Sequence, residues 1–134
     1  MIQKEVAQRV AANPGAMSLL SVSAQLYFNV ELGRVVPANL FLPPPKIDSQ
    51  IIILTPKTDL ITDDPERLLR LVRIGFSSRR KTLLNSLSAG LRKDKFSVGE
   101  TIKDAGINPT IRPQELEITD WLQLLKYSNQ NGLL

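Results

Sequence analysis

The chain has 134 residues, of which 43% are hydrophobic and 22% charged, and its formal net charge is +4, which is typical of a globular protein with one compact domain or two small lobes. It contains no cysteine and no histidine, which argues against disulfides, most metal sites, Ser-His-Asp hydrolases and Cys-His proteases. Because no apolar run reaches about 18 residues, we expect no membrane span, and the lack of cysteine fits a reducing, cytoplasmic location.

Residues 1–55 alternate short helices and strands. A helix is predicted over 4–12, ended by Asn13-Pro14-Gly15. A second helix is predicted over 19–28, with its inward side formed by Leu19, Val22, Leu26 and Phe28. Residues 31–36 and 49–54 predict two strands that pair as an antiparallel ribbon, and the β-branched run at 50–54 predicts a buried strand. Because a two-stranded ribbon is barely stable alone, this part is expected to be cut from a larger α/β sheet.

Residues 56–64 lack a clear period and predict a linker, followed by an all-α bundle at 65–134. Asp64 and Pro65 have the residue types of an N-cap and a first helical position. The first helix is expected over 65–76, with one side formed by Leu68, Leu69, Val72 and Phe76. Further helices are expected over 79–87, 97–105 and, after a Thr119-Asp120 cap, to about residue 127. The expected fold class is therefore α+β.

Basic residues gather between 67 and 95, where Asp94 is the only acid after Arg67. Arg79, Arg80 and Lys81 are expected in the first turn of the 79–87 helix, where the macrodipole disfavours cations. Phosphate groups would offset that cost, and Arg70 and Arg73 on one face of the preceding helix would extend the patch. The alternative is a solvated helix surface whose charges Asp63 and Asp64 neutralise.

Segment 41–49 reads Phe-Leu-Pro-Pro-Pro-Lys-Ile-Asp-Ser. The three consecutive prolines, Pro43 to Pro45, favour a rigid, extended backbone between the two strands. Either Phe41 is a hydrophobic plug on a stiff turn, or its ring stands on a rigid wall at the mouth of a pocket and stacks on a nucleobase. Spacing alone leaves both interpretations open.

Five ordered segments together resemble the ribosomal RNA adenine N6-methyltransferases, in particular the small-subunit dimethyltransferases of the KsgA type. Segment 41–49 resembles their Phe-x-Pro-Pro-Pro-Lys-Val-Asp-Ser signature, with Ile47 as the departure. Segment 3–6 is similar to Gln-Lys-Glu-Val, and 20–25 to Leu-Ser-Val-x-x-Gln. Segment 76–87 resembles Phe-x-x-Arg-Arg-Lys-Thr-Leu-x-Asn-x-Leu, and 106–116 resembles the family's tail. The resemblance covers nearly the whole chain.

The resemblance implies dimethylation of an adenine in small-subunit rRNA with S-adenosylmethionine as the methyl donor. In that family the donor binds a Rossmann-type sheet through a Gly-rich turn, and an Asn-Leu-Pro-Tyr motif accepts the adenine's amino group. By this resemblance, residues 1–55 would be the remnant of that Rossmann-type methyltransferase domain. Phe41, supported by Pro43 and Pro44, would stack on the flipped adenine. The expected contacts to the rRNA are Lys46, Arg70, Arg73, Arg79, Arg80 and Lys81.

Two departures from the family pattern limit this implication. Neither the Gly-rich turn nor Asn-Leu-Pro-Tyr occurs among these residues, and in the family both precede the segment that begins at Gln3. We therefore expect a truncated chain that by itself binds no cofactor and transfers no methyl group. Segment 14–19 lacks the Lys-x-Tyr-Gly of the family, so no substrate contact is assigned to it.

Three hypotheses follow. The first is the C-terminal part of an rRNA dimethyltransferase that carries its RNA-recognition lobe. The second is a stand-alone RNA-binding or ribosome-assembly module, and the third is a helical protein-interaction domain with a solvated basic face. The salt dependence of RNA binding separates the third from the other two.

Overall fold

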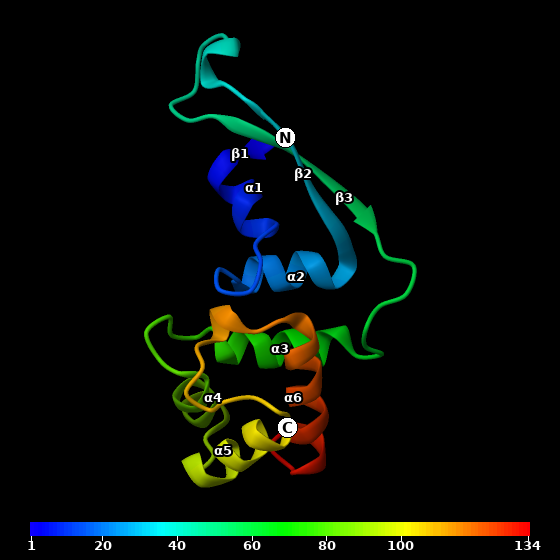
Figure 1. The fold of residues 1–134 in the computed structure, drawn as a ribbon, viewed down its shortest axis with the longest axis vertical. Coiled ribbons are helices and arrows are strands. Elements are labelled where there is room, and N and C mark those ends of the chain that lie inside the picture. The colour runs from blue at the N-terminus through cyan, green and yellow to red at the C-terminus, as the bar shows by residue number, and fades with distance from the viewer.

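In the computed structural model, which describes residues 1–134, a β-hairpin with two helices stands above a group of four helices (Figure 1). The hairpin part contains β1 (Ile2–Gln3), α1 (Lys4–Val10), α2 (Leu19–Tyr27), β2 (Phe28–Val36) and β3 (Ser49–Pro56). The helical part contains α3 (Pro65–Gly75), α4 (Leu83–Leu91), α5 (Lys95–Asp104) and α6 (Ile118–Gln130). The predicted α+β class is confirmed.

The sheet is antiparallel in the order β1-β3-β2. The predicted pairing of the two long strands is confirmed, with Val30 opposite Leu54 and Val36 opposite Ser49. The prediction of two strands is wrong, because β1 adds a third strand opposite Gln50 and Ser49. A strand of two residues is too short for the alternation of side chains by which a strand is predicted.

The prediction that segment 50–54 is a buried strand is also wrong. Only Gln50 is buried, whereas Ile53 and Leu54 are 47% and 45% exposed. Pairing within the sheet satisfies the hydrogen-bonding groups of the backbone but covers neither face of the sheet. The helices do not cover the C-terminal end of β3, which is exposed to solvent. The β-branched run therefore forms the predicted strand without being enclosed.

Helices α1 and α2 are held together by side chains of the 18–25 segment. The Nε2 atom of Gln25 donates hydrogen bonds to the carbonyl oxygens of Val10 (3.0 Å) and Ala12 (2.9 Å) at the end of α1. Ser18 caps α2 by accepting from the backbone N–H of Ser21. The helix ends at Tyr27, so Phe28 begins β2 and does not lie on the inward side of a helix as predicted.

In the helical part, Asp64 caps α3 with Pro65 at its start, as predicted. The predicted helix over 79–87 is wrong: α4 runs from Leu83 to Leu91, and the hydroxyl of Thr82 caps it by accepting from Asn85 N. Asp94 caps α5, and α6 begins after Glu117, whose backbone N–H donates to the Asp120 carboxylate at 3.0 Å. Thr119 and Asp120 therefore lie inside the first turn of α6 and not before it, as predicted for a cap. Local sequence offered several Ser, Thr and Asp caps, and tertiary contacts selected among them.

One hydrophobic cluster of 16 buried residues joins the two parts of the chain. Val22 and Leu26 of α2 belong to it together with Leu71 of α3 and Trp121 of α6. The buried face of α3 is formed by Leu68, Leu71, Val72 and Gly75, so the predicted Leu69 and Phe76 are only partly buried. A division into domains at 56–64 stays a prediction, and Pro56 still belongs to β3.

Two backbone hydrogen bonds connect the loop between α1 and α2 with the C-terminal half of the chain. Gly15 N and Met17 N both donate to the carbonyl oxygen of Gln114, at 2.8 and 3.1 Å. Gln114 lies in a single 3-10 turn, Pro113–Glu115, just before α6. This pairing holds the loop that follows α1 against the turn that precedes α6. None of the helices is long and apolar enough to cross a membrane.

Candidate nucleic-acid interface

The loop of the β-hairpin presents Phe41 at the end of the molecule farthest from α4 and α5 (Figure 1). A 3-10 turn, Ala38–Leu40, precedes it, and the Oδ1 atom of Asp48 accepts a hydrogen bond from Ala38 N at 2.8 Å, which closes the loop. Phe41 is partly buried and belongs to neither the core nor the residues packed against it, whereas Pro43 and Pro44 are exposed. The ring is therefore not sealed within the core.

Arg79, Arg80 and Lys81 are exposed in the turn between α3 and α4. They precede the Thr82 cap, so the prediction that they lie in the first turn of the helix is wrong. No carboxylate lies within ion-pair distance of any of the three, since the one salt bridge in the structure joins Lys103 and Glu100 at 3.7 Å. Asp63 and Asp64 therefore do not neutralise them, and the cations remain available to an anionic partner.

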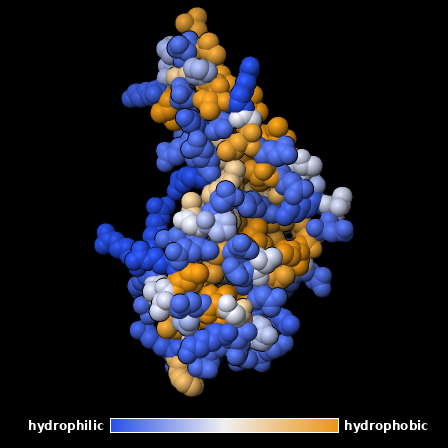
Figure 2. All heavy atoms as spheres, in the orientation of Figure 1, coloured by the Kyte–Doolittle hydropathy of each residue, from blue (hydrophilic) through white to orange (hydrophobic).

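A groove, here named the Arg9–Arg79 groove, lies between α1 and this turn. Its walls include Arg9, Ser18 and Arg79, and its floor includes Met17 and Phe76. The Phe76 ring packs on Trp121 with the ring centres 5.7 Å apart, so the floor is anchored to the core. Figure 2 shows strongly hydrophilic side chains extending from this edge of the molecule, at the level between the hairpin part and the helical part.

Arg9 was not among the residues predicted to contact RNA. It is a single arginine in a short helix, and no motif or charge run marks it. Only the fold brings it beside Arg79, since both line one hollow together with Met17 and Gln114, which are joined by a backbone hydrogen bond. No signal within the local sequence could have identified it.

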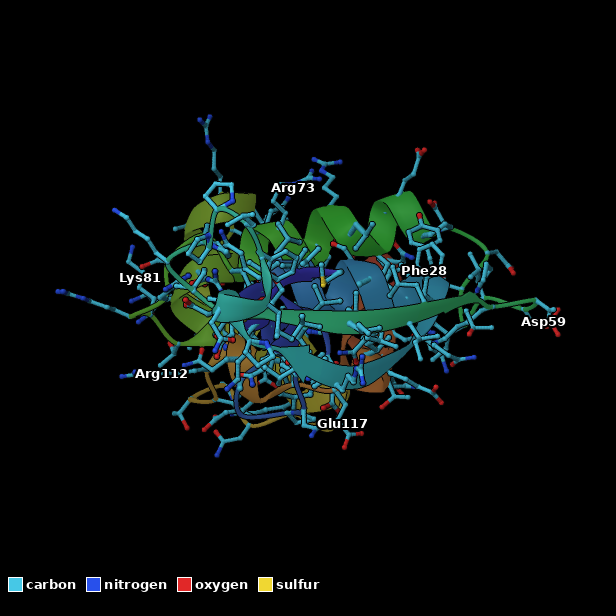
Figure 3. All side chains as sticks on the ribbon, turned by 90° about the horizontal axis from the view of Figure 1, so that it is seen from above. Phe28, Asp59, Arg73, Lys81, Arg112 and Glu117 are labelled. Atoms are coloured by element: carbon cyan, nitrogen blue, oxygen red, sulfur yellow. The ribbon has the colours of Figure 1, made fainter.

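The other predicted RNA contacts lie on different sides of the molecule. Lys81 extends from the side that also carries Arg112, whereas Arg73 points away from α3 on an adjacent side (Figure 3). Arg70 is exposed on the same helix as Arg73. Lys46 lies on the hairpin and lines a shallow hollow with Lys4 and Glu5 of the α1 region. The structure therefore joins Arg79, Arg80 and Lys81 in one turn but does not gather all six predicted residues.

A second basic hollow borders the same turn on the side of α4. It is lined by Lys81, Lys93 and Lys95 together with Asn85 and Ser88. Asp94 lies among these lysines, but its carboxylate already accepts a hydrogen bond from Ser97 N at 2.8 Å as the cap of α5. That bond holds the pKa of Asp94 below its ordinary value of 3.8.

The chemistry available at these surfaces is binding. Guanidinium and ammonium groups pair with phosphate, and an accessible aromatic ring stacks on a base. No three His, Cys, Asp or Glu side chains gather where they could hold a metal ion. The arrangement is typical of an interface with a nucleic acid rather than of a hydrolytic centre.

Comparison with known proteins identifies the family. The family model described as "Ribosomal RNA adenine dimethylase" matches residues 1–130. This chain belongs to the ribosomal RNA adenine dimethylase family. The resemblance inferred from the five sequence segments is therefore confirmed.

Curated relatives in this family carry the name "Ribosomal RNA small subunit methyltransferase A". One from Dehalococcoides mccartyi is 41% identical over 131 residues, covering 96% of this chain and 45% of the relative. Another, from Xanthomonas campestris, is 40% identical over 128 residues, covering 92% of this chain and 47% of the relative. The chain thus spans about half the length of the curated relatives it matches.

Two solved structures in the family's fold also match. The crystal structure of a dimethyladenosine transferase from Plasmodium falciparum superposes with a TM-score of 0.81 at 28% identity, covering 98% of this chain and 57% of that one. The 23S rRNA methyltransferase ErmE superposes with a TM-score of 0.69 at 27% identity, covering 96% of this chain and 52% of that one. Both are methyltransferases, so the hairpin part matches a segment of a methyltransferase fold.

The family implies S-adenosylmethionine as a cofactor, but the residues of the Arg9–Arg79 groove do not fit that molecule. The groove has no acidic side chain to accept hydrogen bonds from ribose hydroxyls. Its two guanidinium groups would also repel the positive sulfonium. The groove is therefore suited to an anion and not to the methyl donor.

Proposed function

We propose that this chain is the RNA-recognition part of an S-adenosylmethionine-dependent rRNA adenine dimethyltransferase that acts on small-subunit rRNA during ribosome biogenesis in the cytoplasm. By itself it binds RNA and does not transfer methyl groups. The observation that carries this proposal is the Arg9–Arg79 groove with the adjoining Arg80 and Lys81, a set of cations without carboxylate partners in a member of an rRNA-modifying family.

The charge of this surface supports a phosphate backbone as the ligand. Each contact between an arginine or lysine and a phosphate releases condensed counterions from the RNA, which favours binding. Two arginines that face one groove can both reach a single phosphate or two successive ones. The floor of the groove is partly apolar, with Met17 and Phe76, and leaves room for the ribose groups of the RNA strand.

The hairpin loop supports a second role, in positioning the target base. Phe41 is outside the core, and the proline segment with the Asp48 hydrogen bond holds its backbone. A flat ring on a rigid loop is suited to stack on an adenine that has left its helix. We assign this role to Phe41, with Pro43 and Pro44 as its support and Lys46 as a phosphate contact beside it.

The absence of catalysis by this chain is proposed from its motifs. The Gly-rich turn and the Asn-Leu-Pro-Tyr segment, which the resemblance connects with donor binding and amine acceptance, do not occur in these residues. The cavities nearest to the candidate interface fit an anion. RNA recognition is the part of the reaction that these residues can perform.

The test is a titration of the full 134-residue chain with a small-subunit rRNA hairpin between about 50 and 200 mM salt. Arg80→Ala is expected to lower the slope of log affinity against log salt by about one. Lys126→Ala on α6 is the matched control and should leave the slope unchanged, because Lys126 lies beside Tyr127 and outside the interface. Affinity without salt dependence would contradict the proposal.

A methylation assay with labelled donor tests the second half of the proposal. No label should reach the RNA from this chain alone, at any RNA concentration that saturates binding. Turnover above the background of a denatured sample would overturn the assignment of a purely binding role.

A further inference from the structure

Phe96 is the one aromatic residue of the chain that is largely exposed. Its side chain is 76% exposed, whereas the other aromatic residues are buried or partly buried. Burying a phenylalanine side chain is worth roughly 1.5–3 kcal/mol, so a ring left in solvent is available to a partner. It lies at the start of α5, at the end of the molecule opposite the hairpin loop (Figure 1).

The surroundings of Phe96 are charged. Lys93 and Lys95 precede it in the sequence and line, together with Lys81, the hollow beside α4. Asp94 is occupied as the cap of α5, and Glu100, one turn further along, pairs with Lys103 at 3.7 Å. None of the three lysines has a carboxylate within ion-pair distance. The ring is therefore a single apolar group beside uncompensated positive charge.

An exposed aromatic ring beside unpaired lysines indicates which kind of partner this surface binds. A protein-docking face needs several adjoining apolar side chains, but the residues that adjoin Phe96 on the face of α5, three and four positions further along, are Gly99 and Glu100. One flat ring flanked by ammonium groups is the arrangement that binds single-stranded nucleic acid, in which a base stacks on the ring and the neighbouring phosphates meet the cations. Lys81, which lines this hollow, lies in the same turn between α3 and α4 as Arg79 of the Arg9–Arg79 groove.

We propose that Phe96 stacks on an unpaired base of the bound RNA while Lys93 and Lys95 contact the phosphates beside that base. This inference rests on the proposed function, because it supplies the same RNA with a second anchor, distant from Phe41. It requires that the RNA present a bulged or looped nucleotide at this end of the molecule. Asn85 adds a polar side chain to the hollow that receives the phosphate.

The test uses the full chain and a hairpin RNA with 2-aminopurine at one bulged position, whose fluorescence falls when the base stacks. In wild type we expect quenching on binding. Phe96→Ala should abolish the quenching and weaken binding about fivefold or more, whereas Phe96→Trp should retain both. The matched control is Ile61→Ala in the linker, an apolar side chain of 41% exposure, which should behave as wild type.

A second RNA separates stacking from general effects of the substitution. A blunt-ended duplex with the same stem sequence, without the bulge and without the hairpin loop, offers no unpaired base, so Phe96→Ala and wild type should bind it equally. Lys93→Gln and Lys95→Gln should each lower the salt slope for the bulged RNA by about one. Equal weakening on both RNAs, or quenching that survives Phe96→Ala, would overturn the inference.

The outcomes also distinguish this inference from the proposed function. If wild type binds no RNA, the proposed function fails. If wild type binds with the expected dependence on Arg80 but Phe96→Ala changes neither quenching nor affinity, only the second anchor fails. A change in oligomeric state on Phe96→Ala, measured by sedimentation without any effect on RNA, would assign the ring to self-association and overturn the inference.

Discussion

Arg9 on α1 and Arg79 in the turn after α3 line the same two adjoining hollows, although they come from opposite halves of the chain. Neither has a carboxylate partner. Two like charges that face one groove repel each other mildly, and an anion between them removes that repulsion. This geometry predicts how the two residues cooperate in binding.

Arg9→Gln and Arg79→Gln are each expected to weaken RNA binding about tenfold and to lower the salt slope by about one, because each removes a charge-assisted bond to phosphate. If both arginines hold one phosphate, the double variant should lose less than the sum of the two single losses. Filter binding across a salt series measures all four proteins, with Lys126→Gln as the control. Full additivity would indicate two separate phosphates, and no loss would remove the groove from the interface.

Phe41→Ala should be studied in a full-length enzyme of the family that carries this hairpin segment. Loss of the ring is expected to lower kcat/KM for methylation about tenfold or more, since stacking on a base is worth roughly 1–3 kcal/mol. RNA affinity should change far less, because most of it comes from phosphate contacts elsewhere. Phe41→Tyr, which keeps the ring, is the control. Equal losses of methylation and affinity would assign Phe41 a structural role in the loop.

Gly75→Ala tests the close approach of α3 and α6. A Cβ atom at Gly75 would overlap the six-membered ring of Trp121, which is fully buried. Overpacking costs about 1–3 kcal/mol, more than the roughly 0.5–1 kcal/mol that alanine gains over glycine in a helix. The free energy of unfolding in urea should therefore fall.

Gly99→Ala on α5 is the matched control for that substitution. Its added Cβ would lie 3.7 Å from Leu84 Cδ1, an ordinary contact, so the helix preference should dominate and stability should be unchanged or slightly higher. If Gly75→Ala stabilised the chain as much as Gly99→Ala, the packing of Trp121 against α3 would be refuted.

Asp94 makes stability depend on pH in the acid range. Its carboxylate accepts from Ser97 N, which lowers its pKa in the folded chain below 3.8. A group with a lowered pKa contributes stability that is complete above its unfolded pKa and is lost as the pH falls through the folded one. Asp94→Asn keeps a capping oxygen but does not titrate, so its unfolding free energy should fall less steeply below pH 3.8 than that of wild type.

Two measurements check this behaviour. Urea unfolding at a series of pH values compares the two slopes, which should coincide well above the titration range. The carboxyl resonance of Asp94 in NMR should show a midpoint below 3.8. A midpoint at or above that value would falsify the capping argument.

Several motif residues are explained by structure rather than by contact with a substrate. Gln25 closes the end of α1 through Val10 and Ala12, and Asp48 closes the hairpin loop through Ala38. These bonds join residues within one supersecondary unit, between 10 and 15 positions apart in the sequence. The residue types that make them are visible in the sequence. The same holds for the Asp64–Pro65 start of α3 and for the pairing of the two long strands.

The local sequence therefore determined which segments form helices, which two segments form the hairpin and where the basic residues gather. The five sequence segments together indicated the family. The local sequence did not determine where α4 begins, because Ser78 and Thr82 are both suitable caps. The choice depends on a distant bond, from Leu83 N to the carbonyl oxygen of Ile111 at 2.8 Å. The burial of β3 and the place of Arg9 were likewise decided only by the fold. Spacing along the chain encodes which residues share a helix face, but two surfaces become one groove only when backbone bonds such as Met17 to Gln114 join distant segments.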